Sequence, residues 1–167
     1  NTLDIVNQYQ GTAIQSKCGH AFIKDVMREH NAVYGGEMSA HHYFRDFAYC
    51  DSGMIPWLLT IALLSETGQA LSTLVENMIT KFPCSGEINF KVADTQATVQ
   101  KIFDHYADQH PQIDRTDGIS LDFGAWRLNV RASNTEPLLR LNIESRAEQN
   151  PQPMQSYVDE LTALIEG

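Results

Sequence analysis

The sequence has little cysteine, little positive charge and no long apolar run. Its three cysteines, Cys18, Cys50 and Cys84, contain no C-x-x-C pair. This argues against a disulfide framework or a zinc site and leads us to expect a reducing, cytoplasmic compartment. Twelve Lys and Arg residues stand against 21 Asp and Glu, a net charge of −9, which disfavours nucleic acid and membrane surfaces as partners. The longest apolar stretch, 55–64, is too short to span a bilayer.

Familiar catalytic signatures are missing as well. The sequence contains no P-loop, no G-x-G-x-x-G and no G-x-S-x-G. It also has no cluster of closely spaced Asp residues that would enclose Mg²⁺. The chain starts at Asn1 without an initiator Met and enters a helical pattern at once. We therefore expect an upstream part to be missing, and we expect no catalytic and no metal-binding residue in this chain.

Hydrophobic periodicity predicts two parts, an α/β part followed by an α+β domain. Residues 1–82 are expected to form an α/β part with a mixed sheet, and the break in the pattern at 82–86 is the expected boundary. Residues 84–167 form a small α+β domain with a four-stranded, mainly antiparallel sheet flanked by helices. The expected helices are 2–9, 21–30, 53–64, 70–81, 95–109 and one near the C-terminus. In the first part, strands are expected at 12–16 and 32–34, followed by a long loop over 37–51.

A group of hydrogen-bond donors lies between two predicted strands near the C-terminus. Its members are Arg131, Ser133, Asn134 and Thr135, with Arg140 beyond. An arginine fork, hydroxyls and loop amides are the donors that a phosphate group needs. The alternative is a polar hairpin loop in which Asn and Pro form the turn.

Two segments of the first part carry further polar groups. Glu37, Ser39 and His41 follow a Gly-Gly pair and are able to pair with neighbouring sugar hydroxyls. The alternatives are a solvated loop, or a metal site at His41 and His42, for which adjacent histidines are weak evidence. Lys17 and His20 precede a predicted helix, where they would receive an anion, cap the helix or face solvent. Cys18 between them is expected to be an inert thiol.

These motifs resemble the α-D-phosphohexomutase superfamily over essentially the whole chain. Gly36-Glu-Met-Ser-Ala-His41 is similar to the family's sugar-recognition loop, and Arg131-Ala-Ser-Asn-Thr-Glu-Pro137 is similar to its phosphate-binding loop. Lys17-Cys-Gly-His20 resembles the segment that helps to hold the substrate. The stretch 36–47 is most similar to bacterial phosphomannomutases, although Ala40 and Cys18 depart from the usual Gly and Thr.

The resemblance implies the end of the third domain and all of the fourth domain of a four-domain enzyme. Such an enzyme interconverts mannose 6-phosphate and mannose 1-phosphate for GDP-mannose synthesis, through a phosphoserine and a bisphosphate. It implies Mg²⁺ and a hexose 1,6-bisphosphate activator for the intact enzyme, with the missing N-terminal domains as partners and an inactive isolated chain. The alternatives are a phosphoglucomutase or dual-specificity enzyme, a non-catalytic phosphosugar-binding module, and a truncated piece without a role of its own.

Overall fold

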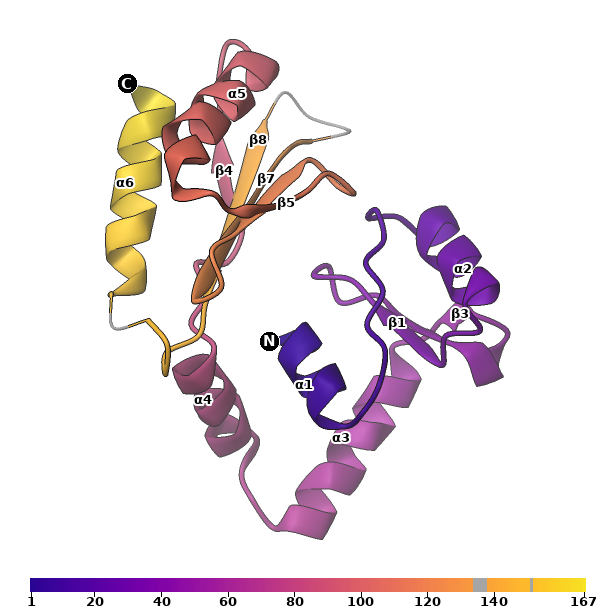
Figure 1. The fold of residues 1–167 in the computed structure, drawn as a ribbon. Helices are drawn as coiled ribbons and strands as arrows, with labels where there is room; N and C mark the ends of the chain where they lie inside the picture. Colours follow the sequence, from indigo (N-terminus) through magenta and orange to yellow (C-terminus); the bar gives the residue numbers. More distant parts are fainter. Residues whose placement is uncertain (134–137, 151) are drawn as a thin grey trace. The chain divides into compact units, whose positions relative to one another are not determined.

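The computed structural model describes residues 1–133, 138–150 and 152–167 (Figure 1). The chain divides into two compact units. One unit is Ile14–Val75, and the other combines Asn1–Ala13 with Glu76–Gly167. The division falls within helix α4 (Leu71–Lys81).

The unit Ile14–Val75 combines helices with a small sheet. Its three strands pair antiparallel in the order β1-β2-β3. The elements are α2 (His20–Glu29), β1 (Tyr34–Gly36), β2 (His42–Phe44), a short 3-10 helix (Arg45–Phe47), β3 (Cys50–Asp51) and α3 (Met54–Thr67). Ile23 and Met27 on one face of α2 pack with Tyr43 of β2 to form its core. The amphipathic spacing of α2 therefore serves to cover the sheet.

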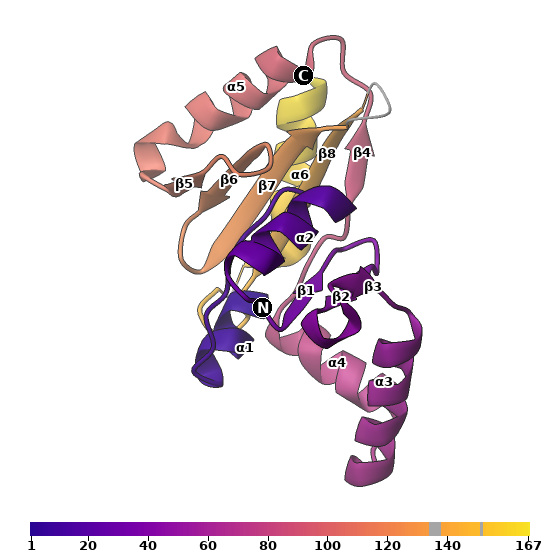
Figure 2. The ribbon, with the colours of Figure 1, turned by 90° about the vertical axis from the view of Figure 1, so that its right-hand side faces the viewer.

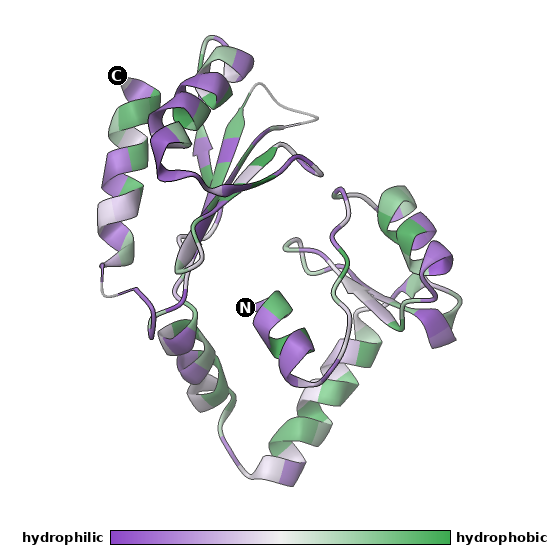
Figure 3. Ribbon diagram, viewed as in Figure 1, coloured by the Kyte–Doolittle hydropathy of each residue, from purple (hydrophilic) through white to green (hydrophobic). Residues whose placement is uncertain are grey.

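Helix α3 is apolar on nearly all sides and contains no buried residue (Figure 3). Its exposed large side chains are Met54, Trp57, Leu58, Leu59, Ile61 and Leu63. Among the described residues, no single helix is long and apolar enough to cross a membrane. Only α3 and α4 taken together satisfy such a test, and they are bent by 98° at the break between them.

The second unit is built on a five-stranded antiparallel sheet of order β4-β8-β7-β6-β5. Helices α5 and α6 cover one face of this sheet (Figures 1 and 2). The elements are α1 (Thr2–Gln8), β4 (Ile88–Phe90), α5 (Thr95–Tyr106), a 3-10 turn (Ala107–Gln109), β5 (Gln112–Asp114), β6 (Ile119–Asp122), β7 (Trp126–Ala132), β8 (Leu139–Ser145) and α6 (Met154–Glu166). Alternate residues of β7 and β8, such as Leu128 and Leu141, are buried, and polar residues alternate with them on the opposite face.

The predicted fold class, an α/β part followed by an α+β domain, is confirmed, but four details were wrong. The C-terminal sheet has five strands instead of four, because the short segment β5 adds an edge strand. Residues 12–16 form no strand, and the first sheet is wholly antiparallel instead of mixed. Much of the predicted loop over 37–51 forms β2, a 3-10 helix and β3. The domain boundary at 82–84 stays a prediction.

Candidate functional site

A tight turn between β1 and β2 presents three of the predicted sugar-binding residues. The Glu37 amide donates to the His41 carbonyl at 3.0 Å, and the Ala40 amide donates to the Glu37 carbonyl at 3.1 Å. Ala40 adopts a left-handed conformation with φ of 62°, a region in which a residue with a Cβ is strained. The turn therefore holds Glu37, Ser39 and His41 within five residues of chain, at the cost of strain at Ala40.

The Glu37 carboxylate is held in position by a hydrogen bond from a core residue, Tyr43. The Tyr43 side chain is fully buried, and its hydroxyl donates a hydrogen bond to Glu37 Oε1. Two effects raise the pKa of Tyr43 well above its ordinary value. Burial of the side chain has the larger effect, and the hydrogen bond to the Glu37 carboxylate has the smaller. Tyr43 thus stays a neutral donor, and the position of the Glu37 carboxylate is set by a residue that cannot move freely.

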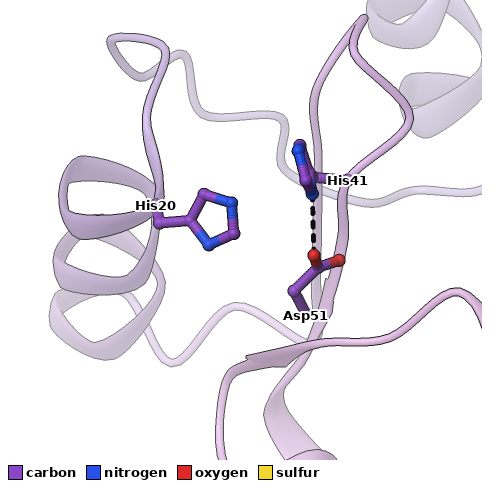
Figure 4. A group of neighbouring side chains, drawn as sticks. All are labelled: His20, His41 and Asp51. Carbon is purple, nitrogen blue, oxygen red and sulfur yellow. Dashed lines mark hydrogen bonds and ion pairs between the residues drawn. The ribbon is translucent and has the colours of Figure 1, made fainter.

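His41 and Asp51 form a directly bonded pair (Figure 4). His41 Nδ1 lies 2.7 Å from Asp51 Oδ2, and Asp51 Oδ1 accepts the backbone amide of His42 at 3.0 Å. The His41 hydrogen bond and then the amide lower the pKa of Asp51, so its carboxylate is ionised. An ionised acceptor at Nδ1 favours the tautomer that leaves Nε2 of His41 as a proton acceptor.

His20, at the first turn of α2, completes this cluster. Its ring lies edge-on to that of His41, with the centroids 4.6 Å apart (Figure 4). The Tyr43 ring is also in edge-on contact with His20, at 5.2 Å between centroids. The structure therefore brings the predicted residues His20, Glu37 and His41 together around Tyr43. Their assignment to sugar binding stays a prediction.

Other polar residues of this region point elsewhere. Lys17 Nζ lies 5.9 Å from the centre of the Phe22 ring, and Ser39 is exposed on the turn. No described contact joins either residue to the cluster. His42 lies on the other side of β2, where its Nδ1 is 2.7 Å from the Tyr34 hydroxyl. The adjacent histidines, His41 and His42, thus do not face a common ligand.

The cluster has the composition of a metal site but not the geometry. In the described part of the chain, His20, His41 and Asp51 are the one group whose potential ligand atoms all lie within 4.8 Å of one another. Neighbouring ligands of a tetrahedral Zn²⁺ are about 3.4 Å apart, and here the His41–Asp51 hydrogen bond already uses two of the three side chains. Two imidazoles and one carboxylate also do not fit Mg²⁺, which prefers oxygen ligands. We therefore interpret the group as a histidine–carboxylate pair with an adjacent histidine.

The predicted phosphate-binding residues lie in the other unit, at one end of β7 and β8. Arg131 and Arg140 are directly opposite in the β7–β8 register, and the Ser133 amide donates to the Leu138 carbonyl at 2.8 Å as the strands diverge. Asn134 and Thr135 lie outside the described residues. The structure therefore brings Arg131, Arg140 and the backbone of Ser133 to the same end of the sheet.

Carboxylates already contact these arginines. Glu87 Oε2 lies 3.5 Å from Arg131 Nη2, and Glu87 Oε1 lies 3.4 Å from Arg140 Nη1. Asp117 Oδ2, in the turn between β5 and β6, lies 3.9 Å from Arg131 Nε. Sequence reasoning missed these two carboxylates, because only the strand order brings them to the arginines.

Asp51 and Tyr43 were missed for a similar reason. At the start of α3, Ser52 Oγ accepts the Ile55 amide at 3.3 Å. Asp51 instead faces His41 because β3 pairs with β2, with Tyr43 opposite Asp51. The one available signal was an acidic residue near the end of a polar loop that also contains histidine.

Comparison with known proteins identifies related domains over most of the chain. Residues 1–82 match the family domain described as "Phosphoglucomutase/phosphomannomutase, alpha/beta/alpha domain III". Residues 87–160 match "Phosphoglucomutase/phosphomannomutase, C-terminal domain". The first match ends at residue 82 and the second begins at residue 87, on either side of the segment 82–86 that interrupts the hydrophobic pattern of the sequence.

Individual relatives agree with these matches. A protein named "Phosphohexose mutases" from Xanthomonas campestris pv. campestris (strain B100) is 57% identical over 167 residues, which are 100% of this chain and 37% of that protein. A "Phosphomannomutase" from Vibrio cholerae is 55% identical over 99% of this chain and 35% of its own length. A solved phosphoglucomutase/phosphomannomutase family protein from Burkholderia thailandensis shares the fold, with a TM-score of 0.71, 22% identity, and coverage of 99% of this chain and 35% of its own. The chain thus spans about a third of the length of its relatives.

Proposed function

Because the chain belongs to the phosphoglucomutase/phosphomannomutase family, we propose that it is the sugar- and phosphate-binding portion of a phosphomannomutase. The enzyme would interconvert mannose 6-phosphate and mannose 1-phosphate through a phosphoserine and a bisphosphate, supplying GDP-mannose synthesis. The names of relatives such as the Vibrio cholerae protein support mannose as the sugar. The observation that carries the proposal is the pair Arg131 and Arg140, held side by side at the end of the sheet.

Each unit would contribute one kind of recognition. Arg131 and Arg140 would hold the phosphate that is not transferred, helped by the loop residues Ser133, Asn134 and Thr135. Glu37 and Ser39 would bind sugar hydroxyls, with Lys17 and His20 nearby in the chain. Hydroxyl-level contacts suit a substrate that must bind in two orientations, because either end of the sugar offers similar groups.

The sequence predicts no catalytic residue in this chain, but the His41–Asp51 pair supports a catalytic role, in which His41 would remove the proton from the sugar hydroxyl that receives the phosphoryl group. The hydroxyl oxygen would form the new bond to phosphorus as the phosphorus–oxygen bond to the serine breaks. Nε2 of His41 would take the hydroxyl proton, and a group outside this chain would protonate the departing serine oxygen. Asp51 would hold the ring and stabilise the imidazolium that results. Mg²⁺ and a hexose 1,6-bisphosphate activator are proposed for the intact enzyme. The described residues do not fit Mg²⁺, and the isolated chain is expected to show no turnover.

Binding of mannose 6-phosphate by the chain tests the proposal. Arg131→Ala should weaken this binding by at least about tenfold, since a hydrogen bond to a charged group contributes about 1.5–3 kcal/mol. Binding of unphosphorylated mannose should not change. Arg127→Ala is the matched control, because Arg127 lies on the same strand and face but contacts Ser120 Oγ at 3.2 Å. Equal affinity of the wild-type chain for mannose and mannose 6-phosphate would refute the phosphate site.

A further inference from the structure

The guanidinium groups of Arg131 and Arg140 repel each other, because the two residues are directly opposite in the sheet. They are cross-strand partners in β7 and β8, and both lie on the face away from the buried residues Val130 and Leu141. Like charges directly opposite each other destabilise a sheet. Both side chains are also largely buried, with 15% and 24% of their surfaces exposed. Water therefore screens their repulsion only in part, and an anion is needed between them.

Glu87 supplies this anion from a third strand. It immediately precedes β4, which pairs with β8 so that Asn89 lies opposite Arg140. Its two carboxylate oxygens are divided between the two guanidinium groups, one at 3.5 Å from Arg131 and one at 3.4 Å from Arg140. A single carboxylate thus bridges both arginines.

The bridge is loose. Charge-assisted hydrogen bonds between guanidinium and carboxylate are typically about 2.7–2.9 Å long, and the strongest pairs use both oxygens on one arginine. Here each contact is longer, and the carboxylate is shared. Asp117 adds a second carboxylate, at 3.9 Å from Arg131. A carboxylate that already occupies both guanidinium groups competes with any other anion for them.

We propose that Glu87 is a resident counter-ion, which a phosphate group must displace from Arg131 and Arg140. The inference rests on the proposed function and adds a positioning residue to its phosphate site. In the absence of ligand, Glu87 holds the two guanidinium groups in place. When phosphate enters, one anion replaces another, so the arginines need little rearrangement, but the repulsion from Glu87 keeps the binding weak. Weak, reversible binding suits an enzyme whose bisphosphate has to turn round between two half-reactions.

Titration of the chain with inorganic phosphate, followed by calorimetry at constant low ionic strength, tests this role. Glu87→Gln keeps the shape of the side chain and removes the competing charge, so phosphate should bind about tenfold more tightly, as expected when like-charge repulsion is removed. Glu87→Asp keeps the charge but is too short to reach both arginines, and its affinity should lie between those of the wild type and Glu87→Gln. Glu144→Gln is the matched control, since Glu144 lies on the same face of β8 opposite Arg127 and changes the net charge equally.

The outcomes separate this inference from the proposed function. Tighter binding by Glu87→Gln, with Glu144→Gln within about twofold of the wild type, supports a local counter-ion instead of a general charge effect. Unchanged or weaker binding by Glu87→Gln, while Arg131→Ala loses binding, overturns the counter-ion role but leaves the phosphate site standing. If Arg131→Ala binds phosphate as well as the wild type, the phosphate site fails and the counter-ion role fails with it. Thermal unfolding of each variant verifies that its fold is intact.

Discussion

At the scale of single residues, Gly118 is the position where the backbone has least room. It has φ of +72°, and an added Cβ would lie 2.4 Å from the Val130 carbonyl oxygen and 2.5 Å from Arg131 Cβ. We expect Gly118→Ala to lower the free energy of unfolding by about 2–5 kcal/mol, the sum of left-handed strain and overpacking. Phosphate affinity should fall as well, because the added methyl group pushes against Arg131. Urea unfolding and phosphate calorimetry measure the two effects.

Gly124 provides the control for this substitution. Its φ of +83° is also left-handed, but nothing lies within 4 Å of an added Cβ. Gly124→Ala should therefore cost only the backbone strain, about 1–2 kcal/mol, and leave phosphate affinity unchanged. Equal losses of stability in the two variants would show that the close approach of residue 118 to Arg131 does not contribute to the loss in free energy of unfolding.

Residue type alone identified the side chains that could bind or react with a ligand, but it did not identify the residues that orient those side chains. Arg131 and His41 stand out in the sequence, because guanidinium and imidazole groups in polar loops have few purely structural uses. Glu87 and Asp51 do not stand out, since an acidic residue beside a strand or helix is ordinary. Glu87 meets Arg131 only because β8 lies between β4 and β7 in the sheet, an order that local sequence does not reveal.

At the scale of elements, length decided what the sequence could predict. Helices of ten or more residues, such as α4 and α5, repeat their apolar pattern over several turns, and their predicted positions are confirmed within a few residues. Strands β2 and β3 have three and two residues, too few to show an alternation. They form because they bury Tyr43 and because Asp51 bonds across them, and both causes depend on tertiary contact.

One ion pair attaches α1 to the five-stranded unit. Arg146, just after β8, donates to Asp4 from Nε at 2.7 Å and from Nη2 at 2.9 Å. These hydrogen bonds lower the pKa of Asp4 below its ordinary value. A carboxyl group with a lowered folded-state pKa stabilises the fold above its unfolded-state pKa, and this contribution is lost as the pH falls through the folded-state pKa.

Replacement of Asp4 should therefore have a pH-dependent cost. We expect Asp4→Asn to destabilise the attachment of α1 by about 0.5–1 kcal/mol at neutral pH, a modest value because both side chains are partly exposed. The difference from the wild type should shrink from neutral to acidic pH, as the carboxyl group of Asp4 becomes protonated first in the unfolded and then in the folded chain. Amide exchange of α1 and urea unfolding at neutral and acidic pH measure it. Asp159→Asn, whose carboxylate accepts a bond from Gln155 on α6, is the control. A cost independent of pH would contradict the ion-pair explanation.

At the scale of the whole molecule, the two units differ in how much apolar surface they bury. In the described residues, the core of the five-stranded unit contains 14 buried side chains, whereas the core of the unit Ile14–Val75 contains three. Helix α3 of the smaller unit exposes Trp57 by 55% and Leu59 by 59%. Because burial of apolar surface is the main source of stability, the two units should not be equally stable.

Unfolding of the chain should therefore proceed in two transitions, with Ile14–Val75 first. Amide exchange along a urea gradient should show residues 14–75 losing protection at lower urea than residues 88–165. Met27→Ala should shift only the first transition and Leu121→Ala only the second, each by about 2–5 kcal/mol, because both side chains are buried in separate cores. A single transition that both variants shift equally would show that the units fold as one. If the proposed function holds, mannose should raise the first transition and inorganic phosphate the second, since a ligand stabilises the unit that binds it.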